Sequence, residues 1–435
     1  MDIAKIFSFH NHCIDHVSIL IVSSTVLFFL MTWGIGANDL GNIMSTTIGA
    51  KIINLQQITF LIIIFEFTGA FIGGNNVTNT IRDNIININQ LHNYPIIIIK
   101  GMLSSLISCT IWMNLSSYFG LPVSITNALV GSMIGFGTIV LGPYSVNWKE
   151  IIHITTGWII SPFLSGITSY IIFLYIKKNI LYQKKMTQSI KYKLNLYLFL
   201  VISLLTFIII FKILKHFNIH LTISKFTILN LLIGILITII IYYIFINKKI
   251  YINQLNEKQN HIQIEKYFSV LMILTACAMI FAHGSNDISL AIGPLSVIYK
   301  LITKVHLYNH KNYIINHQNL NLIKIIGCIG VISGFLTYGK KVINTVGNSI
   351  TSLNSIKSFA ATFSTATIVV IANNTGLPIS VTQTLVGSIF GIGMEKGKKS
   401  INLFIVSNIV LSWIITMPAT FILSIISFKI LMLLI

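Results

Sequence analysis

Two aspartates stand at the ends of long apolar segments. Asp39 closes the motif Gly-Ala-Asn-Asp after the apolar run 17–35, and Asp287 closes the motif Gly-Ser-Asn-Asp after the run 268–281. A carboxylate at membrane depth is energetically costly, so such a residue is interpreted as functional by default. The repetition predicts a duplicated chain with one acidic site in each half, and carboxylates of this kind are suited to binding a cation.

The backbone before the first aspartate is expected to leave the regular helix. The segment after Asp39, LGNIMSTTIG, is too polar for a helix that faces lipid. Small and hydroxyl residues are tolerated at membrane depth where the backbone lines a cavity or packs on protein. We expect a broken helix with unwound backbone at Gly36 to Asn38, which presents carbonyl groups and the Asn38 amide to an ion. The alternative is a helix that leaves the membrane at Gly36, with Asp39 as a solvated cap.

A second motif is repeated more closely and predicts an anion site. The sequence GLPVSITNALVGSMIG at 120–135 recurs as GLPISVTQTLVGSIFG at 376–391. Each copy predicts a turn followed by a helix that Ser or Thr caps, with a Gly-x-x-x-Gly spacing that allows close packing. A buried helix N-terminus carries partial positive charge and binds oxyanions. Two facing copies therefore predict a pocket for one tetrahedral anion.

Two ionisable residues near these motifs have no repeated partner. Glu66 interrupts an apolar run, and the alignment of Gly69 with Gly334 places Val331 at the equivalent position. A structural ion pair or an interfacial position accounts for Glu66 as well as a role in transport does. His283, beside the second Asn-Asp motif, reads as a lone histidine, and we expect it to be structural rather than a general base.

The composition excludes a soluble domain. Hydrophobic residues make up 54% of the 435 residues and charged residues only 9%, whereas a soluble domain has roughly 25% charged residues. The mean hydropathy is +0.83. Apolar windows of about 20 residues, the length that crosses a bilayer, predict an all-α polytopic membrane protein with about 10–12 transmembrane segments in the cell or inner membrane. No small-residue cleavage site follows the first run, so we expect no signal peptide.

The repeated motifs divide the chain into three parts. We expect a first transmembrane repeat at 18–176, a linker with two spans and basic loops at 177–267, and a second repeat at 268–435. If each repeat has an odd number of crossings, the two are inverted in the membrane, and substrate binds at their interface near the midplane. The net charge of +19 does not indicate nucleic acid, because the lysines lie in loops between spans. The richer linker loops are expected to be cytoplasmic.

These motifs resemble those of the inorganic phosphate transporters, the PiT family. The resemblance covers nearly the whole chain outside the linker and rests on GANDLGN, FEFTGAFIGGNNVTNTIRDNI, GLPVSITNALVGSMIGFG, AHGSNDISLAIGPL, GKKVINTVGNSI and GLPISVTQTLVGSIFGIG. It implies an inverted-repeat fold with broken helices and half-helix hairpins, and a homodimer. It also implies phosphate and cation sites shared by both Asn-Asp motifs and both Pro-x-Ser-x-Thr turns.

The resemblance also implies particular site residues. Those expected to bind phosphate are Ser124, Thr126, Asn127, Ser380, Thr382, Gln383, Asn38 and Asn286, and those expected to bind the cation are Asp39, Asp287, Asn38 and Asn286. Asn127 and Gln383 stand where the family often has histidine. Both side chains can form hydrogen bonds, but neither can titrate. A second departure is Asn84, which replaces a glycine expected two places after Arg82.

The expected function is that of a cation-coupled secondary transporter, which imports inorganic phosphate by alternating access. A phosphate held beside both aspartates is repelled by about 3 kcal/mol per pair of unit charges, for roughly 5 Å and an effective dielectric near 20. A bound sodium ion or proton removes this repulsion, so the coupling ion is the only cofactor expected. Sodium is favoured over the proton because the residues that replace histidine cannot titrate.

Other functions remain open to different degrees. A sulfate permease of the same fold is the main alternative, because hydroxyl and amide groups bind either tetrahedral oxyanion, and a proton-coupled symporter of phosphate or metal phosphate is another. We do not expect an enzyme, since neither His-Glu-x-x-His nor Gly-x-Ser-x-Gly appears. We expect no metal site beyond the coupling ion and no nucleic-acid partner.

Overall fold

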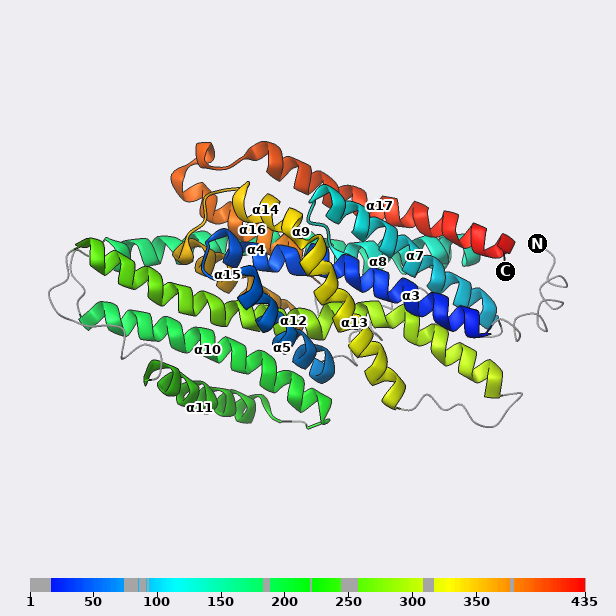
Figure 1. The fold of residues 1–435 in the computed structure, drawn as a ribbon, viewed down its shortest axis with the longest axis horizontal. Helices are drawn as coiled ribbons and strands as arrows, with labels where there is room; N and C mark the ends of the chain where they lie inside the picture. Colours follow the sequence, from blue (N-terminus) through cyan, green and yellow to red (C-terminus); the bar gives the residue numbers. More distant parts are fainter. Residues whose placement is uncertain are drawn as a thin grey trace.

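The computed structural model describes residues 17–73, 85, 91, 94–182, 188–219, 221–243, 257–307, 317–375 and 379–434. Throughout this part of the chain the regular structure is helical, with no strand. The long helices lie side by side along the long axis of the molecule, with α10 and α11 at one edge and α17 at the opposite edge (Figure 1). This architecture confirms the predicted all-α polytopic fold.

The first half of the chain forms six α-helices and one π-helical turn among the described residues. They are α3 (Val17–Ile35), the π-helical turn η2 (Gly36–Leu40), α4 (Gly41–Gly49), α5 (Leu55–Gly73), α7 (Pro95–Phe119), α8 (Ile125–Leu141) and α9 (Trp148–Ile176). A second π-helical turn, η5 (Lys177–Leu181), continues α9. The predicted linker contributes α10 (Gln188–His216) and α11 (Ile223–Ile241).

The second half follows a similar order. It contains α12 (Glu257–Leu307), α13 (His317–Thr337), α14 (Gly339–Asn348), α15 (Ser355–Thr375), α16 (Val381–Gly393) and α17 (Leu403–Leu434). The described residues hold nine helices long and apolar enough to cross a membrane, or ten if the bent pair α13 and α14, which meet at 61°, is one span. Exposed apolar side chains such as Ile159, Phe163 and Ile414 cover the outer faces of α9 and α17, as expected of helices that contact lipid.

The expectation of unwound backbone at Gly36 to Asn38 is wrong. These residues lie in η2, where the chain makes one wider helical turn, and the N–H of Gly41 bonds to the carbonyls of Gly36 and Asn38. A π turn adds a residue without leaving several backbone groups unpaired, which would be costly at membrane depth. In the second half, α12 runs without interruption through 284–287, the positions of the second Asn-Asp motif.

The two Asn-Asp motifs begin with glycines that make equivalent contacts. A Cβ on Gly36 would lie 1.9 Å from the carbonyl oxygen of Val331, and a Cβ on Gly284 would lie 2.4 Å from that of Glu66. Val331 and Glu66 occupy the equivalent positions predicted by the alignment. Each half therefore packs the start of its Asn-Asp motif against the backbone of the other half.

Helices of the two halves interleave rather than forming separate bodies. α5 packs on α12 and α13 packs on α3, while α8 packs on α17 and α16 packs on α9. Hydroxyl groups join α9 to α16 and α7 to α17: Ser169 donates to the carbonyl of Ser388 at 2.8 Å, and Ser108 donates to that of Thr420 at 2.7 Å. Such polar contacts and small residues hold helices together where hydrophobic burial supplies no driving force.

Candidate functional site

The first-half aspartate contacts the second half. Asp39 is buried in η2, and the Thr382 hydroxyl at the start of α16 donates a short hydrogen bond to its Oδ1 atom. Asn42, one turn later on α4, donates to the Thr382 carbonyl at 3.3 Å. The Oδ2 atom of Asp39 has no hydrogen-bond partner among the described residues. Asp39 is therefore a buried carboxylate with one oxygen available, which does not fit the alternative of a solvated cap.

The neighbouring Asn38 holds the first hairpin in place. Its Oδ1 atom accepts from the backbone N–H of Val123 at 2.8 Å. Its Nδ2 atom donates to the carbonyl of Leu121 at 2.9 Å and to the hydroxyl of Ser117 at 3.3 Å. Both ends of the Asn38 amide are thus occupied by the turn between α7 and α8. In this conformation Asn38 orders the hairpin rather than facing a ligand.

Both hairpins begin their second helix with the predicted serine cap. Ser124 accepts from the backbone N–H of Asn127 at 3.4 Å, and Ser380 accepts from that of Gln383 at 3.2 Å. Before α8 the turn depends on Gly120, whose φ of +68° is a left-handed conformation that glycine adopts readily. In the first hairpin the hydroxyls of Ser124 and Thr126 are also paired, at 3.1 Å.

Asn127 and Gln383, at corresponding positions of the two hairpins, each have a buried side-chain oxygen without a hydrogen-bond partner among the described residues. These oxygens are the Oδ1 atom of Asn127 and the Oε1 atom of Gln383, the two residues that replace histidine. Buried polar atoms are almost always satisfied, so an unpaired one requires an explanation. The same unpaired oxygen in both hairpins indicates that a ligand or an ion completes the site.

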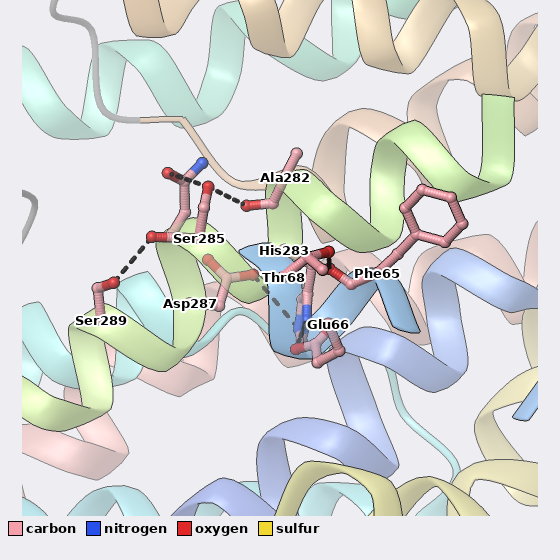
Figure 2. Close-up of polar contacts among 9 residues, drawn as sticks. Phe65, Glu66, Thr68, Ala282, His283, Ser285, Asp287 and Ser289 are labelled. Atoms are coloured by element: carbon pink, nitrogen blue, oxygen red, sulfur yellow. Dashed lines mark hydrogen bonds and ion pairs between the residues drawn. The ribbon is translucent and has the colours of Figure 1, made fainter. Parts of the chain in front are cut away.

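The second-half aspartate has an ionisable neighbour. The Nε2 atom of His283 lies 3.5 Å from Oδ2 of Asp287, and its Nδ1 atom lies 2.7 Å from Oε1 of Glu66. Figure 2 shows His283 between the two carboxylates, with Glu66 arriving from α5 and the other two residues from α12. The view of His283 as a lone histidine is therefore wrong. Glu66 and His283 lie 217 residues apart, so no local pattern could pair them.

The asparagine of the second motif has a partner from the predicted linker. Lys212 on α10 donates from Nζ to the Oδ1 atom of Asn286 at 2.9 Å. Ser285 donates to the same oxygen at 3.3 Å. Sequence analysis missed Lys212 because the linker carries no copy of any motif. The signal that could have identified it is a lysine inside an otherwise apolar, membrane-length segment.

These groups belong to one electrostatic cluster. His283 contacts both Glu66 and Asp287, and Asp39 is likewise buried, in contact with Thr382 of the second half. Among the described residues no group of three or more His, Cys, Asp or Glu side chains could hold a metal ion. The available ligands are carboxylate, amide and hydroxyl oxygens, which suit a hard cation.

The predicted positions Asn79, Arg82 and Asn84 and the turn 376–378 lie outside the described residues.

Fold and site together define a multi-pass helical membrane protein with a buried, charged site where its two halves meet. The chain belongs to the phosphate transporter family, whose model matches residues 35–424. Membership confirms the resemblance found in the sequence motifs and identifies the chain as a transporter rather than an enzyme.

Relatives extend over nearly the whole chain. A Haemophilus influenzae protein named "Putative phosphate permease" is 39% identical over 413 residues, which cover 95% of this chain and 96% of the relative. A Pyrococcus horikoshii protein of the same description is 33% identical over 95% of this chain and 98% of its own. A solved structure described as "The sodium-dependent phosphate transporter" shares 30% identity and a TM-score of 0.82, over 96% of this chain and 100% of its own.

Proposed function

We propose that this protein is a sodium-coupled secondary transporter that imports inorganic phosphate by alternating access. The observation that carries the proposal is the hydrogen bond from Thr382 to Asp39, which joins the hairpin of one half to the acidic motif of the other. A relative movement of the halves would break or remake this contact. The same movement would therefore change the anion site and the cation site together.

The hairpin starts supply the groups expected to bind phosphate. The N-termini of α8 and α16 present backbone N–H groups and partial positive charge, which favour an oxyanion. Ser124, Thr126, Ser380 and Thr382 add hydroxyl groups, and the amides of Asn127 and Gln383 can donate through nitrogen. The amide of Asn286, in the second Asn-Asp motif, is the further donor that we assign to the anion.

Charge makes cation binding a condition for anion binding. Two buried aspartates repel phosphate by about 3 kcal/mol per unit-charge pair at roughly 5 Å and an effective dielectric near 20. The unpaired oxygens of Asp39, Asn127 and Gln383 are ligands of the type that sodium takes. A sodium ion held there lowers the repulsion, and anion and cation then raise each other's affinity by the same factor.

Two observations favour sodium, and one favours the proton. Asn127 and Gln383 cannot titrate, and the solved relative is described as sodium-dependent. His283, however, places a titratable group 3.5 Å from Asp287. Proton coupling is therefore the alternative that the experiment below must distinguish.

The halves at 18–176 and 268–435 are, in this proposal, inverted repeats joined by the linker 177–267, and the protein works as a homodimer. The support for the repeats is their reciprocal packing, α5 on α12 and α13 on α3. Inverted repeats around a central site provide two equivalent conformations, one open to each side of the membrane.

Uptake into proteoliposomes tests the function. Purified protein should accumulate radiolabelled phosphate against its gradient when sodium is high outside, and an ionophore that collapses the sodium gradient should abolish accumulation. Full activity in sodium-free medium under an imposed pH gradient would show that the coupling ion is the proton and not sodium. Accumulation of sulfate without competition by phosphate would overturn the substrate assignment.

A further inference from the structure

The asparagines of the two Asn-Asp motifs differ in what their amides can do. In Asn38 both the oxygen and the nitrogen are bonded to the first hairpin, through Val123, Leu121 and Ser117. In Asn286 the oxygen alone is bonded, and among the described residues its nitrogen has no acceptor. An asparagine amide has two donors and two acceptor positions. Asn286 therefore retains both N–H donors for a ligand.

Lys212 determines which end of this amide is available. Its ammonium lies 2.9 Å from Oδ1 of Asn286 and donates to it. The Ser285 hydroxyl lies 3.3 Å from the same atom but is closer to the carbonyl of Ala282, at 3.0 Å. An ammonium has three donors and no acceptor. A flipped amide would bring its NH₂ group against the ammonium, with donors facing donors. The contact thus holds the oxygen toward Lys212 and leaves the nitrogen for the site.

We propose that Lys212, on a helix outside both repeats, is a positioning residue of the anion site: it fixes the Asn286 amide as an N–H donor for the transported oxyanion. This inference rests on the proposed function. It makes Asn286 a donor to the anion rather than a ligand of the cation, because the ammonium of Lys212 lies against its oxygen and repels a cation there. It also gives the linker helix α10 a direct part in the site.

The ammonium adds charge as well as orientation. It comes from α10 and contacts Asn286, the residue that precedes Asp287 on α12. A positive charge there favours the anion and offsets part of the repulsion from the aspartate. Asn38 has no such neighbour among the described residues, because its contacts are with neutral hydroxyl and backbone groups. The anion site is therefore asymmetric and more positive on its second-half side.

The test separates this role from simple packing of α10. Lys212→Met should raise the phosphate KM about tenfold, the size expected on losing a hydrogen bond to a charged group, with kcat within about twofold of wild type. Lys212→Arg keeps the charge and the donor and should restore the low KM. Lys225→Met, at an exposed position on α11, is the control and should leave both values unchanged.

A double-mutant cycle identifies the partner. If Lys212 acts through Asn286, Lys212→Met should have little further effect on KM in the Asn286→Ala background. Equal effects in both backgrounds, an unchanged KM in Lys212→Met, or a fall in kcat alone would overturn the proposal. If Lys212→Met does not purify as a folded protein, the comparison of Lys212→Gln with Lys212→Arg takes its place. Wild-type uptake is measured with phosphate and with sulfate, so a wrong substrate assignment leaves this test intact with the accepted anion.

Discussion

The two Asn-Asp motifs share a sequence pattern but have different surroundings. Asp39 is bonded to the neutral hydroxyl of Thr382, and its second oxygen is unpaired among the described residues. Asp287 lies beside His283, which also contacts Glu66, and the adjacent Asn286 accepts from Lys212. Among the described residues, Asp287 is in direct contact with a group that can carry positive charge, whereas the side-chain contact of Asp39 is a neutral hydroxyl.

This difference suggests a division of labour between the halves. The packing of the two motifs is equivalent, since Gly36 and Gly284 meet equivalent backbone groups. The chemistry is set by residues outside the copied motifs, such as Lys212 and Glu66. We infer that Asp39 depends on an external cation for neutralisation, whereas Asp287 is partly balanced by the protein itself.

Removing either carboxylate should have the largest effect on transport. Asp39→Asn and Asp287→Asn should each reduce phosphate uptake by about a hundredfold, because either loses the charge that recruits the coupling ion. Glu66→Gln should be milder, since its position has no copy and its carboxylate contacts His283 rather than the expected ligand. Uptake is normalised to folded protein in the membrane. Normal transport by Asp39→Asn would show that this residue has only a structural role and would contradict the different roles inferred for Asp39 and Asp287.

Substituting the glycines should affect both halves alike. Gly36→Ala and Gly284→Ala place a methyl group against a backbone carbonyl, so each should destabilise the protein by about 1–3 kcal/mol. Gly234→Ala on α11 is the control, because its nearest neighbour would lie at an ordinary 3.6 Å. Thermal unfolding in detergent measures the difference. A large loss for one glycine only would show that the halves do not share this packing.

Alanine substitutions of Asn38 and Asn286 should have different effects, the first on protein stability and the second on phosphate binding. Asn38→Ala removes three hydrogen bonds to the first hairpin, one of them from the buried N–H of Val123, and should lower stability by about 1–2 kcal/mol. Asn286→Ala should leave the melting temperature near that of wild type and raise the phosphate KM. The same pattern for both variants would contradict the different roles inferred here.

Valine substitutions of Thr382 and Thr126 should give the smallest difference in phosphate uptake between the two halves. Thr382→Val removes the donor to Asp39 and should reduce uptake about tenfold, as expected for a hydrogen bond to a charged group. Thr126→Val removes a hydroxyl paired with Ser124 in its own hairpin, and should cost only about twofold to threefold. Initial uptake rates at saturating sodium provide the comparison, and a reversed order would place the main contact between halves elsewhere.

Local patterns in the sequence predicted much of this molecule. The serine caps at Ser124 and Ser380, the turn that begins at Gly120 and the close packing of the repeated glycines depend on residues near one another in the chain.

Features that depend on distant residues were not predictable. The contact between Glu66 and His283 joins α5 to α12, and the contact between Lys212 and Asn286 joins the linker to the second half. The π turn at Gly36–Leu40 also escaped prediction, because glycine and polar residues at membrane depth favour a broken helix and a widened one equally.

Equilibrium binding of radiolabelled phosphate to purified protein at increasing sodium concentration tests the central claim most directly. Phosphate affinity of the wild type should rise with sodium and then saturate, because the two ions are linked through the shared site. Asp39→Asn should lose this dependence, whereas Glu66→Gln should keep it. Phosphate affinity independent of sodium in the wild type, or the same sodium dependence in Asp39→Asn, would contradict the assignment of Asp39 as the carboxylate that needs an external cation.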